Sequence, residues 1–221
     1  MCAMKVCTDS CILGAYTPVA GANSILDIGT GTGLLALMVA QRSAAFIQAV
    51  EIDEAAASQA RQNIQASPWA NRIAVQHQSL QQLAAQKPQP YYLIICNPPF
   101  YAASHQSPSK ARNLAMHSQE LTFPEIVNFC HQFLSATGKL FILLPPAESL
   151  TFKDLAASAN LHLTSTLKIF TTTTGKHIRT IQGFSPTATA PLPEEELFIR
   201  KPDNSYTPTF RALLKEYYLQ F

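Results

Sequence analysis

Charged side chains are scarce in this sequence, and long hydrophobic runs are absent. Charged residues make up 14% of the 221 residues, and the formal net charge of +2 is too small to indicate nucleic-acid binding by itself. No stretch approaches the roughly 18 uninterrupted apolar residues of a membrane span, and no signal-peptide pattern opens the chain. We therefore expect a cytoplasmic protein, and because 47% of the residues are hydrophobic, a globular one with one substantial core.

Cysteine is too rare and too irregularly spaced to predict disulfides or a metal site. The five cysteines are an odd number, and Cys96 and Cys130 lie in apolar segments, where a reduced thiol behaves as a small hydrophobic group. Cys2, Cys7 and Cys11 match no common zinc spacing and have no histidine nearby. We therefore expect neither a disulfide nor a bound metal.

Carboxylates are missing from one long segment in the last third of the chain. No Asp or Glu occurs between Asp154 and Glu194. The basic and titratable residues in this gap are His162, Lys168, Lys176, His177 and Arg179. This distribution favours an anionic partner here, although a solvated surface strand would show the same pattern.

Residues 24–145 alternate short apolar runs with helical patterns, which is typical of βαβ units around a mainly parallel sheet. Strands are predicted at residues 24–28, 46–52, 73–76, 91–96 and 139–144, and later at 161–170, 179–184 and 197–199. Helices are predicted at residues 34–42, 54–65, 123–134 and 207–218, and a loop at 183–193. We expect one domain, with residues 1–23 as an N-terminal segment, 24–145 as a core and 146–221 as C-terminal strands and a helix.

The first strand runs into a glycine-rich loop, "DIGTGTG", at residues 27–33. Gly29, Gly31 and Gly33 allow the backbone to bend sharply and to approach a ligand closely. The G-x-G-x-G spacing differs from the G-x-G-x-x-G of dinucleotide folds, and the preceding Asp27 would repel a phosphate. Asp27 suits an ammonium group, directly or through water, which points to the methionine part of S-adenosylmethionine.

The second strand ends in "VEID", where a carboxylate can accept hydrogen bonds from both ribose hydroxyls of a nucleoside. We assign Glu51 to that role and expect Ile52 to pack on the adenine. A glycine loop alone is also compatible with a tight structural turn. Together with Asp27 and Glu51, it predicts a site for S-adenosylmethionine.

The fourth strand ends in "NPPF", formed by Asn97, Pro98, Pro99 and Phe100. The two prolines fix φ and lack an N–H, so the turn is rigid and carbonyl groups stay free as acceptors. The Asn97 side-chain oxygen and the Pro98 carbonyl can accept hydrogen bonds from the two hydrogens of a planar amino group. They would thereby align its nitrogen with a cofactor methyl. We expect Phe100 to stack on the target group.

The combination of "DIGTGTG", "VEID" and "NPPF" resembles the class I amino-methyltransferases that modify adenine N6, cytosine N4 or the glutamine side-chain amide. Residues 2–19, 62–73 and 200–221 are further similar to the bacterial tRNA1(Val) adenine-37 N6-methyltransferase family. That resemblance covers nearly the whole chain. It implies a doubly wound, mainly parallel seven-stranded sheet with helices on both faces, S-adenosylmethionine as cofactor and a tRNA anticodon loop as substrate.

The resemblance also assigns roles to individual residues. Residues 5–9 would form a lid over the cofactor, with Thr8 touching it. Many class I methyltransferases place an acidic residue after the third strand to bind the adenine amino group, whereas this chain has Ser79 and Leu80 there. Phosphate contacts are expected from the C-terminal Lys168, Lys176 and Arg179, and from the loop after "NPPF", which contains Lys110, Arg112 and His117.

Two other functions stay open at this point. The "NPPF" chemistry also serves a protein glutamine amide, but release-factor methyltransferases carry a sizeable helical domain ahead of the glycine loop, and only 26 residues precede Asp27 here. Another nucleic-acid adenine N6-methyltransferase would share all the motifs. A non-catalytic protein that binds RNA or a partner is disfavoured by the intact "NPPF". The sequence does not predict the oligomeric state.

Overall fold

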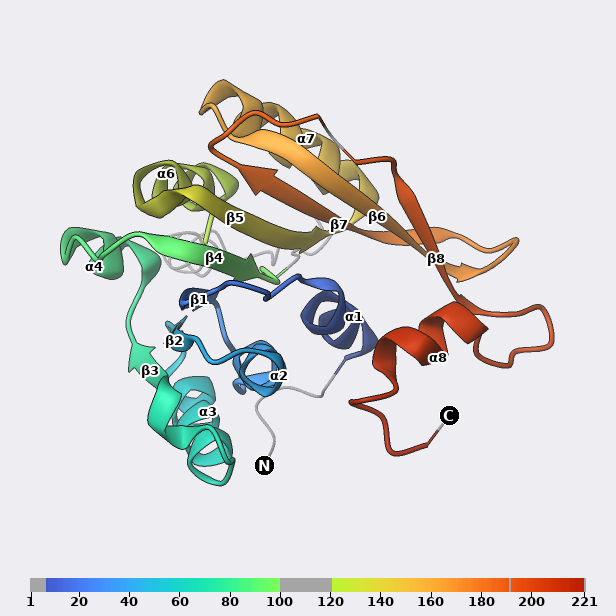
Figure 1. Ribbon diagram of the computed structural model, residues 1–221, viewed down its shortest axis with the longest axis horizontal. Coiled ribbons are helices and arrows are strands. Elements are labelled where there is room, and N and C mark those ends of the chain that lie inside the picture. Colours follow the sequence, from blue (N-terminus) through green and yellow to red (C-terminus); the bar gives the residue numbers. More distant parts are fainter. Residues whose placement is uncertain (1–6, 100–120, 191, 221) are drawn as a thin grey trace, which may run out of the picture.

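An eight-stranded sheet forms the centre of the computed structural model, which describes residues 7–99, 121–190 and 192–220 (Figure 1). The strands stand in the order β3-β2-β1-β4-β5-β7-β6-β8. Their bounds are β1 Ser24–Ile28, β2 Phe46–Glu51, β3 Ile73–His77, β4 Tyr91–Cys96, β5 Leu134–Leu144, β6 His162–Thr172, β7 His177–Ser185 and β8 Glu195–Arg200.

The strand order reverses between β1 and β4. From β1, the chain adds β2 and then β3 on one side, and it returns to place β4 and then β5 on the other, all in parallel. β7 is antiparallel to both β5 and β6, and β8 pairs in parallel with β6. In such a sheet, ligands bind beyond the carboxyl ends of the strands at the point of reversal. The ends of β1 and β4 are therefore the expected place for a site.

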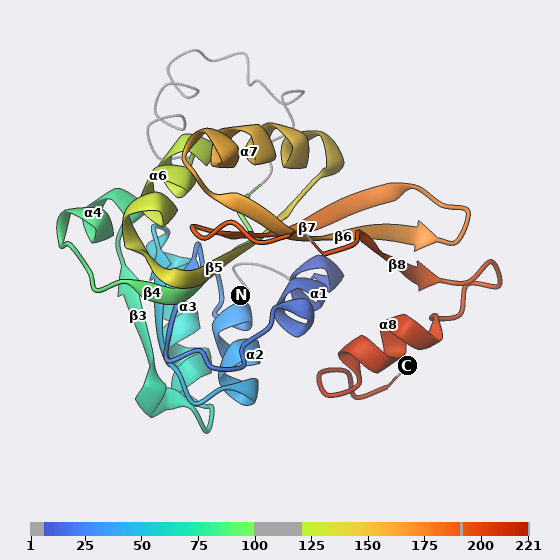
Figure 2. The same cartoon turned by 45° about the horizontal axis from the view of Figure 1, so that its top comes forward.

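Helices cover both faces of the sheet (Figure 2). One face is covered by α1 (Thr8–Tyr16), α2 (Leu34–Arg42), α3 (Glu54–Gln65) and α8 (Pro208–Leu214). The opposite face is covered by α4 (Leu80–Ala85), α6 (Phe123–Phe133) and α7 (Pro146–Ser158). A short 3₁₀ turn, Ala70–Arg72, precedes β3. No helix in the described ranges has both the length and the apolarity of a membrane span.

The central strands are apolar on both sides because helices bury both of their faces. In β4, Leu93 and Ile95 belong to the core on the α1 and α2 side, and Ile94 and Cys96 to the core on the α6 and α7 side. All four side chains are at most 1% exposed. This two-sided burial explains why β4 reads as a continuous apolar run without alternation.

The predicted fold class is confirmed, but the sheet has eight strands where seven were expected. The predicted run at residues 197–199 extends into β8, which pairs with β6 and so lengthens the sheet at its edge. The predicted helix at residues 123–134 ends one residue earlier because Leu134 already pairs with Tyr91 as the start of β5. The predicted loop at 183–193 begins later, since β7 continues to Ser185 beside His162.

Within the described residues, three α-helices were not predicted. α1 lies in the segment expected to be a lid, and residues 7–9 are its N-cap and the start of its first turn. α4 has six residues, and Leu80 and Leu83 are its only large apolar side chains, so the sequence gives little helical periodicity to detect. α7 follows Pro145 and has Pro146 as its first residue, a position where proline is favourable because the missing N–H would have no helical partner.

Candidate active site

The carboxyl ends of β1, β2 and β4 bring three of the predicted motifs together. Ile28 pairs with Val50 on one side and with Cys96 on the other. The next residues along these three strands are Gly29, Glu51 and Asn97. The glycine loop, the acidic strand end and the "NPPF" turn therefore start side by side at the point where the strand order reverses.

The glycine loop has the backbone conformation that its residues predict. Gly29, Gly31 and Gly33 have φ angles of +67°, +58° and +87°, a region that other residues rarely adopt. The N–H groups of Gly29 and Thr30 both donate to the Val50 carbonyl, at 2.9 and 3.1 Å, and so tie the loop to β2. A β-carbon built at Gly29 meets no atom within 4 Å, so the loop faces open space there.

Asp27 is fully buried in β1, on the sheet face covered by α2. Its Oδ2 accepts hydrogen bonds from the Thr30 hydroxyl at 2.6 Å and from the Ala36 N–H at 3.1 Å. Its Oδ1 is buried and has no partner within the described residues. Burial, with a smaller contribution from the nearby Glu51 charge, raises the pKa of Asp27 to about 7, although the hydrogen bonds from Thr30 and Ala36 act to lower it. A cationic group close to Oδ1 would supply the missing partner and favour the ionised carboxylate.

Glu51 ends β2 and organises the loops around it. One carboxylate oxygen accepts from the Gly31 N–H at 2.8 Å, and the other accepts from the Asp53 N–H at 3.0 Å. A carboxylate offers about four lone-pair positions, so two remain for hydroxyl donors. The neighbouring Ile52 is 47% exposed, an unusual position for an isoleucine unless an apolar surface covers it.

Ser79 and Leu80 lie at the beginning of α4. The Ser79 hydroxyl accepts from the Gln82 N–H at 3.1 Å, and the Gln82 side chain accepts from the Ser79 N–H at 2.8 Å. Ser79 is therefore half of a capping box, a local structural role that the sequence pattern S-x-x-Q could have revealed. The Leu80 side chain is buried in the core, so any contact of Leu80 with a cofactor would come from its backbone.

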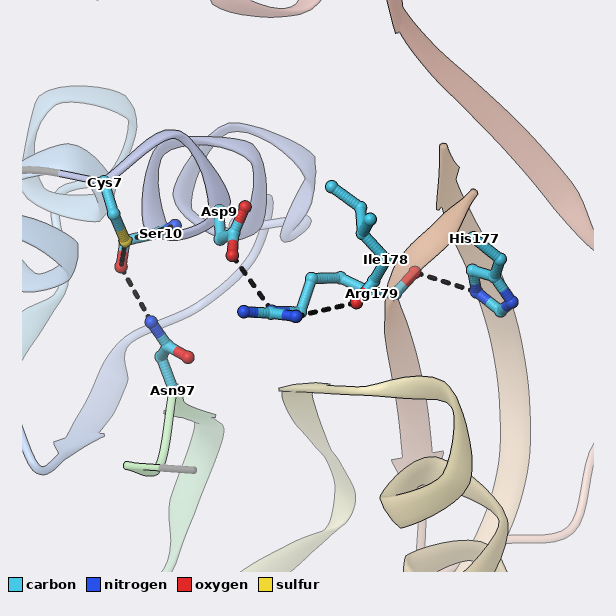
Figure 3. Close-up of polar contacts among 7 residues, drawn as sticks. All are labelled: Cys7, Asp9, Ser10, Asn97, His177, Ile178 and Arg179. Atoms are coloured by element: carbon cyan, nitrogen blue, oxygen red, sulfur yellow. Dashed lines mark hydrogen bonds and ion pairs between the residues drawn. The ribbon is translucent and has the colours of Figure 1, made fainter. Parts of the chain in front are cut away.

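Asn97 is held by a residue of α1 that lies 87 positions earlier in the sequence. Its side-chain Nδ2 donates to Ser10 Oγ of α1 at 2.7 Å (Figure 3). Its Oδ1 is buried and has no partner within the described part of the chain. Pro98 is buried and Pro99 is exposed. The turn after β4 thus presents an amide whose nitrogen is engaged and whose oxygen is available as an acceptor.

Ser10 is a site residue that the sequence reasoning missed, because α1 was not predicted. It lies in the first turn of α1, two residues beyond the predicted cofactor residue Thr8. Asp9, between them, forms an ion pair with Arg179 of β7, with 2.9 Å between Oδ2 and Nε. Figure 3 shows both contacts, with α1 lying between the end of β4 and β7. The contacts connect three elements that are far apart in the sequence.

The predicted RNA-binding residues differ in whether an ion pair engages them and in whether they lie among the described residues. Arg179 faces α1 through its ion pair with Asp9. Lys168 on β6 lies 2.5 Å from a Glu194 carboxylate oxygen, so its charge is partly neutralised. Lys176 is exposed in the connection between β6 and β7. The predicted residues Phe100, Lys110, Arg112 and His117 lie outside the described residues. Among the residues described, no group of three or more His, Cys, Asp or Glu could hold a metal ion.

Comparisons with known proteins show the family to which the chain belongs. Residues 3–147 match the family model described as "Methyltransferase small domain". The chain is 42% identical to a Dyadobacter fermentans protein named tRNA1(Val) (adenine(37)-N6)-methyltransferase, over 100% of this chain and 92% of that protein. A Tolumonas auensis protein of the same name is also 42% identical, over 99% and 92% of the two chains. The chain belongs to the tRNA1(Val) (adenine(37)-N6)-methyltransferase family.

Solved structures support the fold of this methyltransferase family member. An Agrobacterium tumefaciens protein described as a predicted O-methyltransferase has a TM-score of 0.74 and 18% sequence identity, and the match covers 94% of this chain and 96% of that one. At that identity the likeness concerns the fold alone. The resemblance drawn from "DIGTGTG", "VEID" and "NPPF" is thus confirmed at the level of the family, by the relatives that share the whole chain.

Proposed function

We propose that this protein transfers a methyl group from S-adenosylmethionine to N6 of adenine 37 in the anticodon loop of tRNA1(Val). The observation that carries the proposal is the buried Asn97 Oδ1, which has no partner among the described residues and lies at the end of β4 beside the glycine loop. Relatives that share the full length of the chain and bear the corresponding name support it.

The residues around the glycine loop fit the proposed cofactor. The loop leaves open space at Gly29, Glu51 keeps acceptor capacity for the ribose hydroxyls, and the exposed Ile52 offers an apolar surface for the adenine. Asp27 Oδ1 lacks a partner that an ammonium group could supply, directly or through water. When bound, the cofactor supplies a methyl group activated by a positively charged sulfur.

Asn97 and Pro98 act by positioning the nitrogen that receives the methyl group. The Asn97 Oδ1 and the Pro98 carbonyl accept hydrogen bonds from the two N6 hydrogens. These hydrogen bonds draw electron density onto the nitrogen and favour the tetrahedral geometry that it adopts during attack. Because the nitrogen loses its extra proton after the new bond has formed, no general base is required beforehand. Burial of Oδ1 strengthens the interaction, since competing water is excluded.

The target adenine must leave its stack to reach this turn. In a single-stranded loop, unstacking costs a few kcal/mol at most, and stacking on an aromatic residue such as Phe100 can offset it. Lys176, exposed between β6 and β7, is proposed to contact phosphates, together with Lys168 and Arg179 if their ion pairs exchange partners. Such contacts make binding weaken steeply as the salt concentration rises.

The substrate proposal is tested by methyl incorporation into unmodified tRNA1(Val) and into the same tRNA with guanine in place of adenine 37. We expect labelling of the first RNA only, and weaker binding of both RNAs at higher salt. Equal labelling of the two RNAs would exclude adenine 37 as the target. Labelling of a protein glutamine instead would replace the proposed substrate class.

The role of Asn97 is tested with Asn97→Ala. Removal of a group that stabilises the transition state should lower kcat by at least about a hundredfold, with a much smaller change in cofactor affinity. Asn71→Ala, at an exposed position in the turn before β3, serves as the matched control and should retain activity. Wild-type turnover in Asn97→Ala would refute the proposed role.

A further inference from the structure

We propose that Ser10 is a positioning residue, which orients the Asn97 amide so that its oxygen faces the amine to be methylated. The proposal rests on the proposed function, because it takes Asn97 Oδ1 as an acceptor for the target. Ser10 Oγ lies 2.7 Å from Asn97 Nδ2, and the two residues are 87 positions apart in the sequence. Cys7 Sγ lies on the other side of the same hydroxyl, at 3.1 Å (Figure 3).

The directions of these hydrogen bonds follow from the chemistry of the groups. The amide Nδ2 carries only donors, so Ser10 Oγ accepts from it. The single hydroxyl hydrogen is then free to point at Cys7 Sγ, which also accepts from the Ser10 backbone N–H at 3.5 Å. In this arrangement the Asn97 amide nitrogen donates to the Ser10 hydroxyl, and the hydroxyl donates to the Cys7 sulfur. Asn97 Oδ1 is left as the acceptor.

The reverse orientation of the amide would be unproductive. Turned by 180°, Asn97 would point its two N–H donors at an amino group that is itself a donor, and transfer would lose the contact that polarises the nitrogen. An asparagine amide has nearly the same shape in both orientations, so packing alone discriminates poorly between them. A hydroxyl can donate as well as accept, so Ser10 favours the amide nitrogen over the oxygen because its own hydrogen is directed at Cys7 Sγ, which leaves only acceptor positions facing Asn97.

The helix that carries Ser10 is fixed at both of its ends. Next to Ser10, Asp9 is paired with Arg179 of β7 at 2.9 Å. At the other end, the Arg42 guanidinium of α2 donates to the Gly14 carbonyl and, at 2.8 Å, to the Thr17 carbonyl. These contacts hold α1 against two neighbouring elements, so the Ser10 hydroxyl is presented to Asn97 in a constant place.

Loss of this hydroxyl should affect turnover more than binding. A neutral hydrogen bond contributes about 0.5–1.5 kcal/mol, so Ser10→Ala should lower kcat by about two- to tenfold. Both described side-chain hydrogen bonds of Ser10 go to Cys7 and Asn97, and neither goes to the glycine loop or to Glu51. The dissociation constant of S-adenosylmethionine should therefore change by less than about twofold.

The test measures kcat, the KM for tRNA and the cofactor dissociation constant in the full chain. Ser10→Thr keeps a hydroxyl on the same carbon and should restore most of the turnover that Ser10→Ala loses. Ser158→Ala is the control, because Ser158 is exposed and its hydroxyl donates to the Asp154 carbonyl of its own helix, its one hydrogen bond among the described residues. If Ser10→Ala loosened the fold in general, cofactor affinity and thermal stability would fall together with kcat, and the positioning role would be rejected.

A double-mutant cycle separates this inference from the proposed function. In an Asn97→Ala background, Ser10→Ala should have no further effect on kcat, because the group that it orients is gone. Additive losses would overturn the positioning role while leaving Asn97 in place. Unchanged turnover in Asn97→Ala would instead overturn the role of Asn97 on which the inference rests, absence of methyl transfer to adenine 37 by the wild-type protein would overturn the proposed function itself, and wild-type turnover in Ser10→Ala alone would overturn only the inference.

Discussion

Cofactor affinity should depend on pH through Asp27. This carboxyl is fully buried, and burial raises its pKa to about 7 in the protein without cofactor. Its proposed partner, the ammonium group of S-adenosylmethionine, favours the ionised carboxylate and so lowers the pKa when bound. Binding therefore requires the carboxyl to lose its proton, and acidification through pH 7 weakens binding.

The magnitude follows from the fraction of ionised Asp27. With a pKa near 7, about half of the unliganded molecules are ionised at pH 7, and only about one in thirty at pH 5.5. If the pKa in the complex lies below this window, the dissociation constant should rise about fifteenfold from pH 7 to pH 5.5. The cofactor's own α-amino group keeps its proton below about pH 7.7, so it does not titrate in this window.

The assay is isothermal titration calorimetry with S-adenosylmethionine at several pH values, in buffers of different ionisation enthalpy. The wild-type protein should release about half a proton per cofactor at pH 7, and nearly one at pH 6. Asp27→Asn, which cannot ionise, serves as the reference for other groups that titrate in this range.

Two results would contradict this reasoning. A dissociation constant that stays constant from pH 7 to 5.5 in the wild type would show that Asp27 does not sense the cofactor. The same pH dependence in wild type and in Asp27→Asn would assign the effect to another group. Circular dichroism on both proteins over the same pH range checks that each remains folded.

Two further predictions concern the loops around the cofactor. Glu51→Ala should raise the cofactor dissociation constant by about ten- to a hundredfold, since charged hydrogen bonds contribute about 1.5–3 kcal/mol. The kcat at saturating cofactor should change little. An equal loss of cofactor affinity and of kcat would place Glu51 in the chemical step. Gly33→Ala should lower the free energy of unfolding, measured by urea denaturation, by about 1–2 kcal/mol, because φ is +87° at this position. An unchanged midpoint of the urea transition would mean that the turn relaxes to accept the alanine.

The cofactor half of the site could be predicted from the sequence because its signals are local. The glycine loop and the "VEID" and "NPPF" strand ends each occupy a few consecutive residues, and the rule for strand ends in α/β sheets places them together. The fold confirms that placement, since Ile28 pairs with both Val50 and Cys96. Strand 91–96 was predicted with its observed bounds for the same reason: a short apolar run ends at prolines.

The contacts of α1 could not be predicted in this way. Ser10 meets Asn97, and Asp9 meets Arg179, only after the chain has folded, and no spacing in the sequence indicates either pair. Lys168 was expected to be available to phosphates, but its neighbour Glu194 comes from beyond the gap in carboxylates, brought next to it when residues 192–200 return along β6. Charge counted along the sequence therefore overestimates the free positive charge of this surface.

The anchoring of α1 has a consequence for the order in which the protein is assembled during synthesis. Tyr16, near the end of α1, donates its hydroxyl hydrogen to Glu195 of β8 at 2.7 Å, across 179 positions of sequence. A ribosome releases residue 16 long before residue 195, and contacts of such large sequence separation are slow to form. The helix α1 therefore reaches its full set of contacts only after β8 has emerged from the ribosome.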